Sequence, residues 1–194
     1  MDAVDAAFAA IPRAGFLPRS AAHRASYDGP IPIGHGQTNS QPRTVENMLR
    51  LLEVRPGDRV LDVGSGSGWT TALLAQLVGP TGSVLGLEIR PDLVTLGAEN
   101  VRAFGMPWVS VEPAARDTLG SPDRAPFDRI LVSAAARSLP EELVDQLGDG
   151  GRLVMPVAGT LLLVVRRGES RTVTRHGSYR FVPLLTHRRP GADV

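Results

Sequence analysis

A short apolar run meets a loop of alternating glycines in Val60-Leu61-Asp62-Val63-Gly64-Ser65-Gly66-Ser67-Gly68. Such a run is typical of a buried strand that turns directly into a helix. Glycine lets the backbone turn tightly and lets a ligand approach without a Cβ in the way. Leu73, Leu74 and Leu77 follow at helical spacing. The stretch therefore predicts a strand, a ligand-binding loop and a helix in succession.

Short apolar runs alternate with amphipathic segments on either side of this loop, which is the pattern of parallel strands joined by crossover helices. Continuous apolar runs suit strands that are covered on both faces. We therefore expect strands at 60–63, 84–89, 109–111, 130–132 and 153–157. Helical spacing predicts helices around 45–52, 73–77 and 93–104, and Pro42, Pro91 and Pro140 each suit the first turn of a helix.

The two ends of the chain depart from this alternation. Apolar runs at 161–165 and 179–185, linked by a polar stretch, predict an antiparallel hairpin at the C-terminal end. The first 40 residues are rich in proline and glycine, and only 4–11 has a helical pattern. We expect one domain over 1–194, with an N-terminal helix and active-site flap at 1–41 and a cofactor-binding core at 42–194.

Composition excludes several classes of function. All 21 basic side chains are arginines, and they nearly cancel 20 acids to leave a net charge of +1. This balance, without a basic stripe, argues against a nucleic-acid partner. The absence of cysteine excludes disulfides and thiolate metal sites, and the absence of lysine excludes a P-loop. No apolar run is long enough for a membrane span, so we expect a cytoplasmic protein without a bound metal.

Glu88 ends the strand that follows the glycine loop. A carboxylate at this place can accept hydrogen bonds from both ribose hydroxyls of a nucleoside. The alternative is a solvated strand end, but a carboxylate in an apolar run is costly unless it has a partner. Glu88 therefore indicates a nucleoside ligand.

The loop also distinguishes between cofactors. Dinucleotide sites use G-x-G-x-x-G with a helix N-terminus aimed at phosphate, whereas Gly64, Gly66 and Gly68 form G-x-G-x-G with Asp62 just before them. A phosphate would be repelled by Asp62, and a sulfonium cofactor with an α-amino group would be favoured. We expect S-adenosylmethionine. The alternatives are a nicotinamide-dependent oxidoreductase, which this spacing disfavours, and a loop in which Asp62 only bonds backbone amides.

The run 30–42, Pro30-Ile31-Pro32-Ile33-Gly34-His35-Gly36-Gln37-Thr38-Asn39-Ser40-Gln41-Pro42, resembles the protein-L-isoaspartate O-methyltransferases. The resemblance continues through the glycine loop and the blocks 125–130, 132–135, 146–147, 150–157 and 180–184. It implies a class I methyltransferase fold with a seven-stranded sheet. It further implies that 37–40 flanks the methionine end of the cofactor, that Ser40 holds the substrate carboxylate and that 182–184 contacts the substrate backbone.

The chain departs from the family pattern at two places. Asn39 replaces a usual aliphatic residue, which would add a polar group beside the reacting centre. Ala115-Arg116-Asp117 stands where the family has a Gly-Asp-Gly block whose aspartate receives the adenine amino group, and Asp117, displaced by one position, is the candidate substitute. From the residues alone, Ser40 is a polar residue ahead of a helix capped by Gln41, and His35 is a loop histidine without a chemical role.

These inferences give one candidate site. The catalytic residue is Ser40, the cofactor-binding residues are Gln37, Thr38, Asn39, Ser40, Asp62, Gly64, Ser65, Gly66, Ser67, Gly68, Glu88, Ile89, Arg116 and Asp117, and the substrate-binding residues are Ser40, Ala134, Val182, Pro183 and Leu184.

The resemblance implies repair of aged proteins: methylation of L-isoaspartyl residues with S-adenosylmethionine as donor and S-adenosylhomocysteine as product, by an enzyme expected to be monomeric. The alternatives are a diverged relative that methylates a dedicated peptide or small-molecule carboxylate, and a cofactor-binding protein without catalysis.

Overall fold

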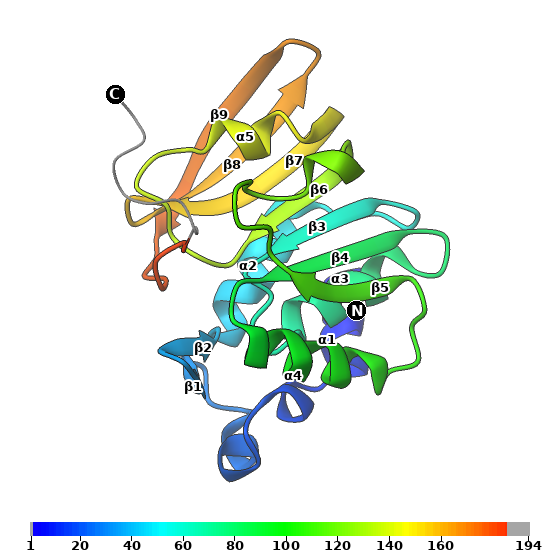
Figure 1. Cartoon of the computed structure of the whole chain (residues 1–194), viewed down its shortest axis with the longest axis vertical. Coiled ribbons are helices and arrows are strands. Elements are labelled where there is room, and N and C mark those ends of the chain that lie inside the picture. Colours follow the sequence, from blue (N-terminus) through cyan, green and yellow to red (C-terminus); the bar gives the residue numbers. More distant parts are fainter. Residues whose placement is uncertain (1, 186–194) are drawn as a thin grey trace.

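A seven-stranded sheet forms the centre of the computed structural model, which describes residues 2–185 (Figure 1). Its strands are ordered β5-β4-β3-β6-β7-β8-β9. The pairs from β5 to β7 are parallel, whereas β8 pairs antiparallel with β7 and β9 antiparallel with β8. The bounds are β3 (Arg59–Val63), β4 (Ser83–Glu88), β5 (Val109–Pro113), β6 (Phe127–Val132), β7 (Leu147–Val157), β8 (Thr160–Arg167) and β9 (Ser170–Ser178). The predicted α/β sheet and the implied strand number are confirmed.

Helices cover both faces of this sheet, as predicted. One core lies between the sheet and four helices: α1 (Ala3–Ala10), α2 (Pro42–Leu52), α3 (Trp69–Val78) and α4 (Pro91–Arg102). A second core on the opposite face includes the short α5 (Glu141–Val144). Consecutive strand residues alternate between the two cores, so Val60 belongs to the first and Leu61 to the second. This alternation explains why the strands are apolar throughout.

The helix starts agree with the proline prediction at two of three places. Pro42 and Pro91 stand in the first turn of α2 and α4. The prediction for Pro140 is wrong, because it is the residue before α5 and has an extended backbone, with φ −76° and ψ 113°. Proline lacks an N–H to donate, so it is equally acceptable in either position.

The C-terminal hairpin is confirmed, but its second strand is not the predicted one. The polar stretch expected to be a linker forms β9, and the apolar run 179–185 contains no strand. β9 lies at the edge of the sheet with all but one of its residues exposed, so it has no need of apolar side chains. Pro183 instead forms an isolated bridge with Ala135. We call residues 182–185 the strap.

The N-terminal residues pack on the helices that cover one face of the sheet: α1 contacts α2 and α3, and the turn after it contacts α4. After α1, two short 3-10 turns, η1 (Arg13–Phe16) and η2 (Arg19–Arg24), lead to a hairpin of β1 (Ile31–Gly34) and β2 (Gln37–Asn39). A third such turn, η3 (Pro122–Arg124), precedes β6. Among residues 2–185, no helix has the length and apolar character to cross a membrane.

Candidate active site

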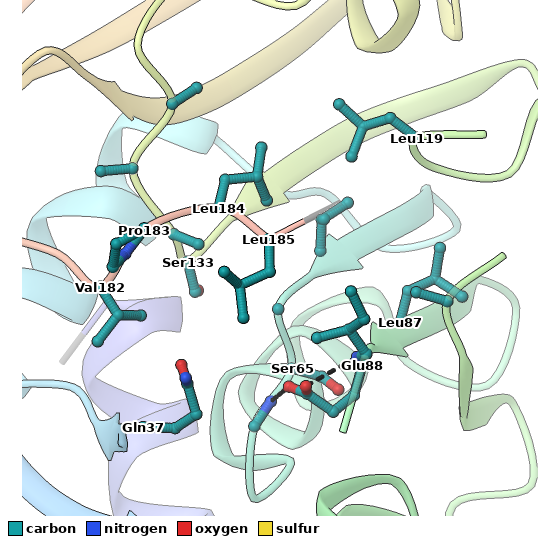
Figure 2. A pocket seen from close by; sticks show the side chains of 18 of the residues that line it. Gln37, Ser65, Leu87, Glu88, Leu119, Ser133, Val182, Pro183, Leu184 and Leu185 are labelled. Atoms are coloured by element: carbon teal, nitrogen blue, oxygen red, sulfur yellow. Dashed lines mark hydrogen bonds between the residues drawn. The ribbon is translucent and has the colours of Figure 1, made fainter. Parts of the chain in front are cut away.

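A cavity of about 1030 Å³ opens at the carboxyl ends of β3, β4 and β6. This edge of a parallel sheet is where open α/β folds bind their ligands. The β1–β2 hairpin lines one side of the cavity and the strap lines another. Figure 2 shows Leu185 pointing from the strap into the space, with Gln37 and Glu88 on different sides. Its volume is at the upper end of the range of about 300–1,000 Å³ that is usual for small-molecule sites.

The glycine loop between β3 and α3 forms the floor of the cavity. The amides of Gly64 and Ser65 donate to the carbonyl of Leu87, at 2.8 and 3.1 Å, which fixes the loop against β4. Gly66 has a φ of +55°, which disfavours a side chain. Gly68 has a φ of +88°, and a Cβ there would lie 2.9 Å from the carbonyl oxygen of Gly97. Gly68 therefore holds the loop against α4 and is not part of the cavity wall.

Glu88 lies at the end of β4 and lines the cavity, although it is only 5% exposed. Its carboxylate accepts hydrogen bonds from the amides of Gly66 (2.9 Å), Ile89 (2.7 Å) and Arg90 (2.9 Å). A carboxylate has about four acceptor positions. Three are used here, so the group is held in one orientation and can still accept from a ligand hydroxyl. This is the arrangement expected of a residue that binds a ribose.

The structure corrects the prediction for Asp62. Its side chain is fully buried beneath the loop, and it does not line the cavity. One carboxylate oxygen accepts from the hydroxyls of Thr70 (2.8 Å) and Thr71 (2.7 Å). Burial raises the pKa of Asp62 to about 6, against the opposing effect of these two hydrogen bonds. The carboxylate supports the loop from below, and the sequence could not separate this role from direct contact with a ligand.

Two buried polar atoms under the loop have no hydrogen-bond partner among the described residues: the second oxygen of Asp62 and the hydroxyl of Ser65. Gly86 lies opposite Asp62 in the sheet, and a Cβ on this glycine would lie 2.9 Å from the Thr71 hydroxyl and 3.2 Å from the Ser65 Cβ. Buried polar groups in folded proteins nearly always have partners. These two atoms are therefore left for a polar group that the described residues do not supply.

The acceptor-side residues come from the end of the flap. Gln37, Thr38 and Ser40 line the cavity, and the hydroxyl of Ser40 has no hydrogen-bond partner within residues 2–185. The backbone carbonyl of Ser40 accepts from the buried guanidinium of Arg13, at 2.9 Å. Gln41 is the residue before α2, as predicted, but its side chain caps no amide. The carboxylate of Asp28 accepts from the amide of Arg43 instead, at 3.1 Å.

The sequence predicted that Asn39 would add a polar group beside the reacting centre. In the structure its side chain is buried and bonded to the protein instead. The residue is 4% exposed. Its Oδ1 accepts from Nε of Arg13 at 2.7 Å, and its Nδ2 donates to the hydroxyl of Ser67 at 3.3 Å. Both ends of the amide are therefore occupied by the protein.

The strap is fastened to the residues that follow β6. The amide of Ala135 donates to the carbonyl of Val182, and the amide of Leu184 donates to the carbonyl of Ala135, both at 2.8 Å. These two bonds hold Val182, Pro183 and Leu184 along the cavity, beside Ala134. The bridge explains why an apolar run without a strand is nevertheless ordered.

The far end of the cavity holds Ile89, Arg116 and Asp117 with residues that the sequence did not indicate. Arg116 and Asp117 are exposed, on the loop that follows β5. The residues that the sequence did not indicate are the apolar walls, Val63, Trp69, Leu87, Leu119 and Leu185, and the polar residues Ser133, Arg137, Ser138 and Glu142. Val63 and Ser133 fall in stretches that carry the family resemblance and Leu185 falls in the apolar run 179–185, whereas the remaining residues carry no motif that distinguishes them from core or surface positions.

His35 lies in the turn between β1 and β2 and does not line the cavity. Its Nε2 is 3.1 Å from a carboxylate oxygen of Asp92 on α4, and both side chains are largely exposed. Within the described residues, no group of three potential ligands could hold a metal ion.

The predicted set converges on one site with two exceptions, Asp62 and Gly68. Those that line the cavity are Gln37, Thr38, Asn39, Ser40, Gly64, Ser65, Gly66, Ser67, Glu88, Ile89, Arg116, Asp117, Ala134, Val182, Pro183 and Leu184.

Comparisons with known proteins match the family that the sequence resembles. A family model described as Protein-L-isoaspartate(D-aspartate) O-methyltransferase (PCMT) matches residues 1–189. Protein-L-isoaspartate O-methyltransferases from Methanocella arvoryzae and Methanopyrus kandleri are 43% and 41% identical to the chain. Each match covers 90% of this chain, and they cover 94% and 80% of those proteins.

A crystal structure of a protein-L-isoaspartate O-methyltransferase homologue from Plasmodium falciparum, in complex with S-adenosyl-L-homocysteine, superposes with a TM-score of 0.85 at 28% identity. The match covers 95% of this chain and 91% of that one.

Proposed function

Since the chain belongs to the protein-L-isoaspartate(D-aspartate) O-methyltransferase family, we propose that it methylates the carboxylate of L-isoaspartyl residues in damaged proteins or peptides, with S-adenosylmethionine as the donor. The observation that carries the proposal is the continuity of one cavity. The same space is lined by the glycine loop and Glu88 on the cofactor side, and by Ser40 and the strap on the acceptor side.

The residues present fit S-adenosylmethionine. Gly64 and Gly66 leave the loop surface without side chains, and Glu88 has acceptor capacity left for a ribose hydroxyl. Ile89 and Leu119 provide apolar surface at the far end, where Arg116 and Asp117 are candidates to contact the adenine. When bound, the cofactor supplies an electrophilic methyl group on a sulfonium.

The protein's part in the reaction is orientation and exclusion of water. A carboxylate with a reference pKa near 4 is already ionised at neutral pH, so the acceptor needs no general base. The Ser40 hydroxyl is free to donate to it, and the strap lies along the cavity with backbone groups fixed by Ala135. Such positioning is a major source of rate enhancement, because it replaces an encounter in solution with a fixed geometry. The flap and the strap wall the site on two sides, which limits access of water.

The structure weakens the argument for a dedicated small-molecule acceptor. That alternative rested on a polar Asn39 beside the reacting centre and on the altered block 115–117, and the Asn39 amide is bonded at both ends to Arg13 and Ser67. A peptide acceptor is also favoured by the volume of the cavity, about 1030 Å³, and by its exposed residues Arg116 and Arg137.

The decisive experiment compares two peptides of the same sequence, one with aspartate and one with isoaspartate, incubated with labelled S-adenosylmethionine. We expect base-labile methyl ester on the isoaspartyl peptide only. Replacement of Ser40 by alanine should lower turnover at least about tenfold, since it removes a hydrogen bond to a charged group, while the affinity for S-adenosylhomocysteine stays within about twofold. Labelling of both peptides alike, or of neither, would contradict the proposal.

The same proposal includes one domain, with 1–41 as helix and flap on the core 42–194, and a cytoplasmic monomer without nucleic-acid or membrane partners. Support for one domain comes from α1 and η1, whose Ala7 and Phe16 belong to the same core as α2 and α3. The absence of cysteine supports a cytoplasmic location, and the balanced charge supports the absence of a nucleic-acid partner. Light scattering after size exclusion would test the monomer.

A further inference from the structure

Arg13 is a buried cation at the centre of the flap, and it is only 5% exposed. Its guanidinium donates to the carbonyl oxygens of Tyr27 (2.8 Å), Gly29 (2.8 Å) and Ser40 (2.9 Å), and to Oδ1 of Asn39 (2.7 Å). Within the part of the chain that the structure describes, it forms no ion pair. The flap is therefore folded around one guanidinium that neutral oxygens stabilise, and Asn39 supplies the side-chain acceptor.

Asn39 extends this cluster to the cofactor loop. Its Nδ2 donates to the Ser67 hydroxyl at 3.3 Å, and the carbonyl of Ser67 accepts from Nδ2 of Asn100 on α4 at 2.9 Å. A continuous series of hydrogen bonds thus runs from Tyr27 and Gly29 in the flap, through Arg13 and Asn39, to the loop that faces the cofactor. Its central members, Arg13, Asn39 and Ser67, are buried, where hydrogen bonds are directional and costly to leave unmade.

We propose that the Arg13–Asn39–Ser67 bridge couples the cofactor loop to the flap, so that a ligand on the loop rigidifies the flap and places Ser40 for the acceptor. Asn39 is the positioning residue in this bridge. It acts through Ser67 on one side and through Arg13 on the other, and Arg13 in turn holds the carbonyl of Ser40. The role assigned to Ser40 rests on the proposed function, whereas the coupling of loop and flap does not.

The bridge can be broken at Asn39 with little change in shape. Asn39→Leu keeps the volume but leaves Nε of Arg13 without its acceptor and frees the Ser67 hydroxyl. Asn39→Asp keeps an oxygen for Arg13 and a second oxygen that can accept from Ser67, so it should restore the bridge. His35→Asn is the matched control, because His35 is on the same hairpin, its side chain pairs with Asp92 outside the bridge, and asparagine tolerates its φ of +54°.

Amide hydrogen exchange on the full chain, with and without saturating S-adenosylhomocysteine, measures the coupling directly. Residues 27–34 are the reporter, because none of them lines the cavity and any protection there must be transmitted. In the wild-type protein and in His35→Asn and Asn39→Asp, the ligand should slow exchange in 27–34 by about fivefold or more. In Asn39→Leu this slowing should disappear, while protection of the loop 64–68 remains.

Equal protection of 27–34 in the wild-type protein and Asn39→Leu would overturn the proposal, as would a wild-type flap that does not respond to the ligand. Ser67→Ala cuts the bridge from the loop side and must give the same loss if Asn39→Leu does not fold. A merely structural role for Asn39 would lower the melting temperature and leave the ligand response of 27–34 intact. If isoaspartyl peptides are not methylated but the flap still responds, the proposed function fails and the coupling stands.

Discussion

Asp62 should make the protein less stable as the pH rises, whereas a buried carboxylate with a charged partner has the opposite effect. Replacing Asp62 with asparagine should therefore remove this loss of stability. Asp62 is fully buried beneath the glycine loop, with Thr70 and Thr71 as hydrogen-bond donors. Burial raises its pKa from 3.8 to about 6. The folded protein therefore binds a proton more tightly than the unfolded chain does.

The sign follows from proton linkage. Between pH 4 and pH 6 the folded state holds more protons than the unfolded state, so stability falls as the pH rises. The contribution of Asp62 is fully present below its unfolded pKa and is lost as the pH rises through about 6. At 1.36 kcal/mol for each pKa unit, the rise from 3.8 to about 6 corresponds to about 3 kcal/mol.

Urea unfolding of the wild-type protein and Asp62→Asn, without cofactor, tests this between pH 4 and 7.5. Asparagine keeps an oxygen for Thr70 and Thr71 but carries no charge. The unfolding free energy of Asp62→Asn relative to wild type should therefore increase by about 2 kcal/mol across this range, less than the full value of about 3 kcal/mol because the unfolded carboxyl is already more than half ionised at pH 4. Asp123→Asn, which removes an exposed carboxylate on η3, should show little relative change. A relative stability of Asp62→Asn that is constant with pH, or that falls, would refute the reasoning.

Three further predictions concern the cavity and its loop. Glu88→Gln removes the charge that accepts from the amides of Gly66, Ile89 and Arg90, so calorimetry should show S-adenosylhomocysteine affinity lower by about tenfold or more; an unchanged affinity would remove Glu88 from the cofactor site. Gly68→Ala should destabilise the protein by about 2 kcal/mol or more in urea, because its φ is +88° and the new Cβ would lie 2.9 Å from the carbonyl of Gly97. Gly159→Ala, with φ +82° and open space, isolates the backbone strain and should cost about half as much; equal losses would show that contact with α4 is unimportant. Leu185→Ala should raise the KM for an isoaspartyl peptide with little effect on melting temperature, because Leu185 is 40% exposed and points into the cavity. A large loss of stability would instead show that Leu185 is a core residue.

The glycine loop and the strands around it could be predicted because their constraints are local. A turn between a buried strand and a helix needs positive φ at Gly64, Gly66 and Gly68, and a sheet covered on both faces needs continuous apolar runs. β9 could not be found in this way. An edge strand on the surface has no buried face to dictate its residues, so its polar sequence resembles that of a loop.

The residues of the candidate site differ in the same way: those under local constraints could be predicted, and those that depend on long-range packing could not. Glu88 could be identified because a carboxylate at the end of an apolar strand is costly to bury unless a partner or a ligand compensates it. The position of Asp62 beneath the loop could not be predicted, because sequence does not reveal on which side of a loop a carboxylate lies. The partnership of Arg13 with Asn39 spans 26 positions of sequence and joins two segments without regular periodicity, so it became visible only in three dimensions.

The exposed outer edge of β9 has a consequence for a protein that acts on aged polypeptides. In the described sheet, β9 has a neighbour on one side only, so its other row of backbone groups is available for pairing with an extended chain. Damaged proteins expose such chains. Arg171 and Arg175 are spaced along this strand, and Arg171 is paired with Glu141. Charged side chains of this kind discourage edge-to-edge aggregation, which keeps the enzyme from joining the misfolded material among which it works.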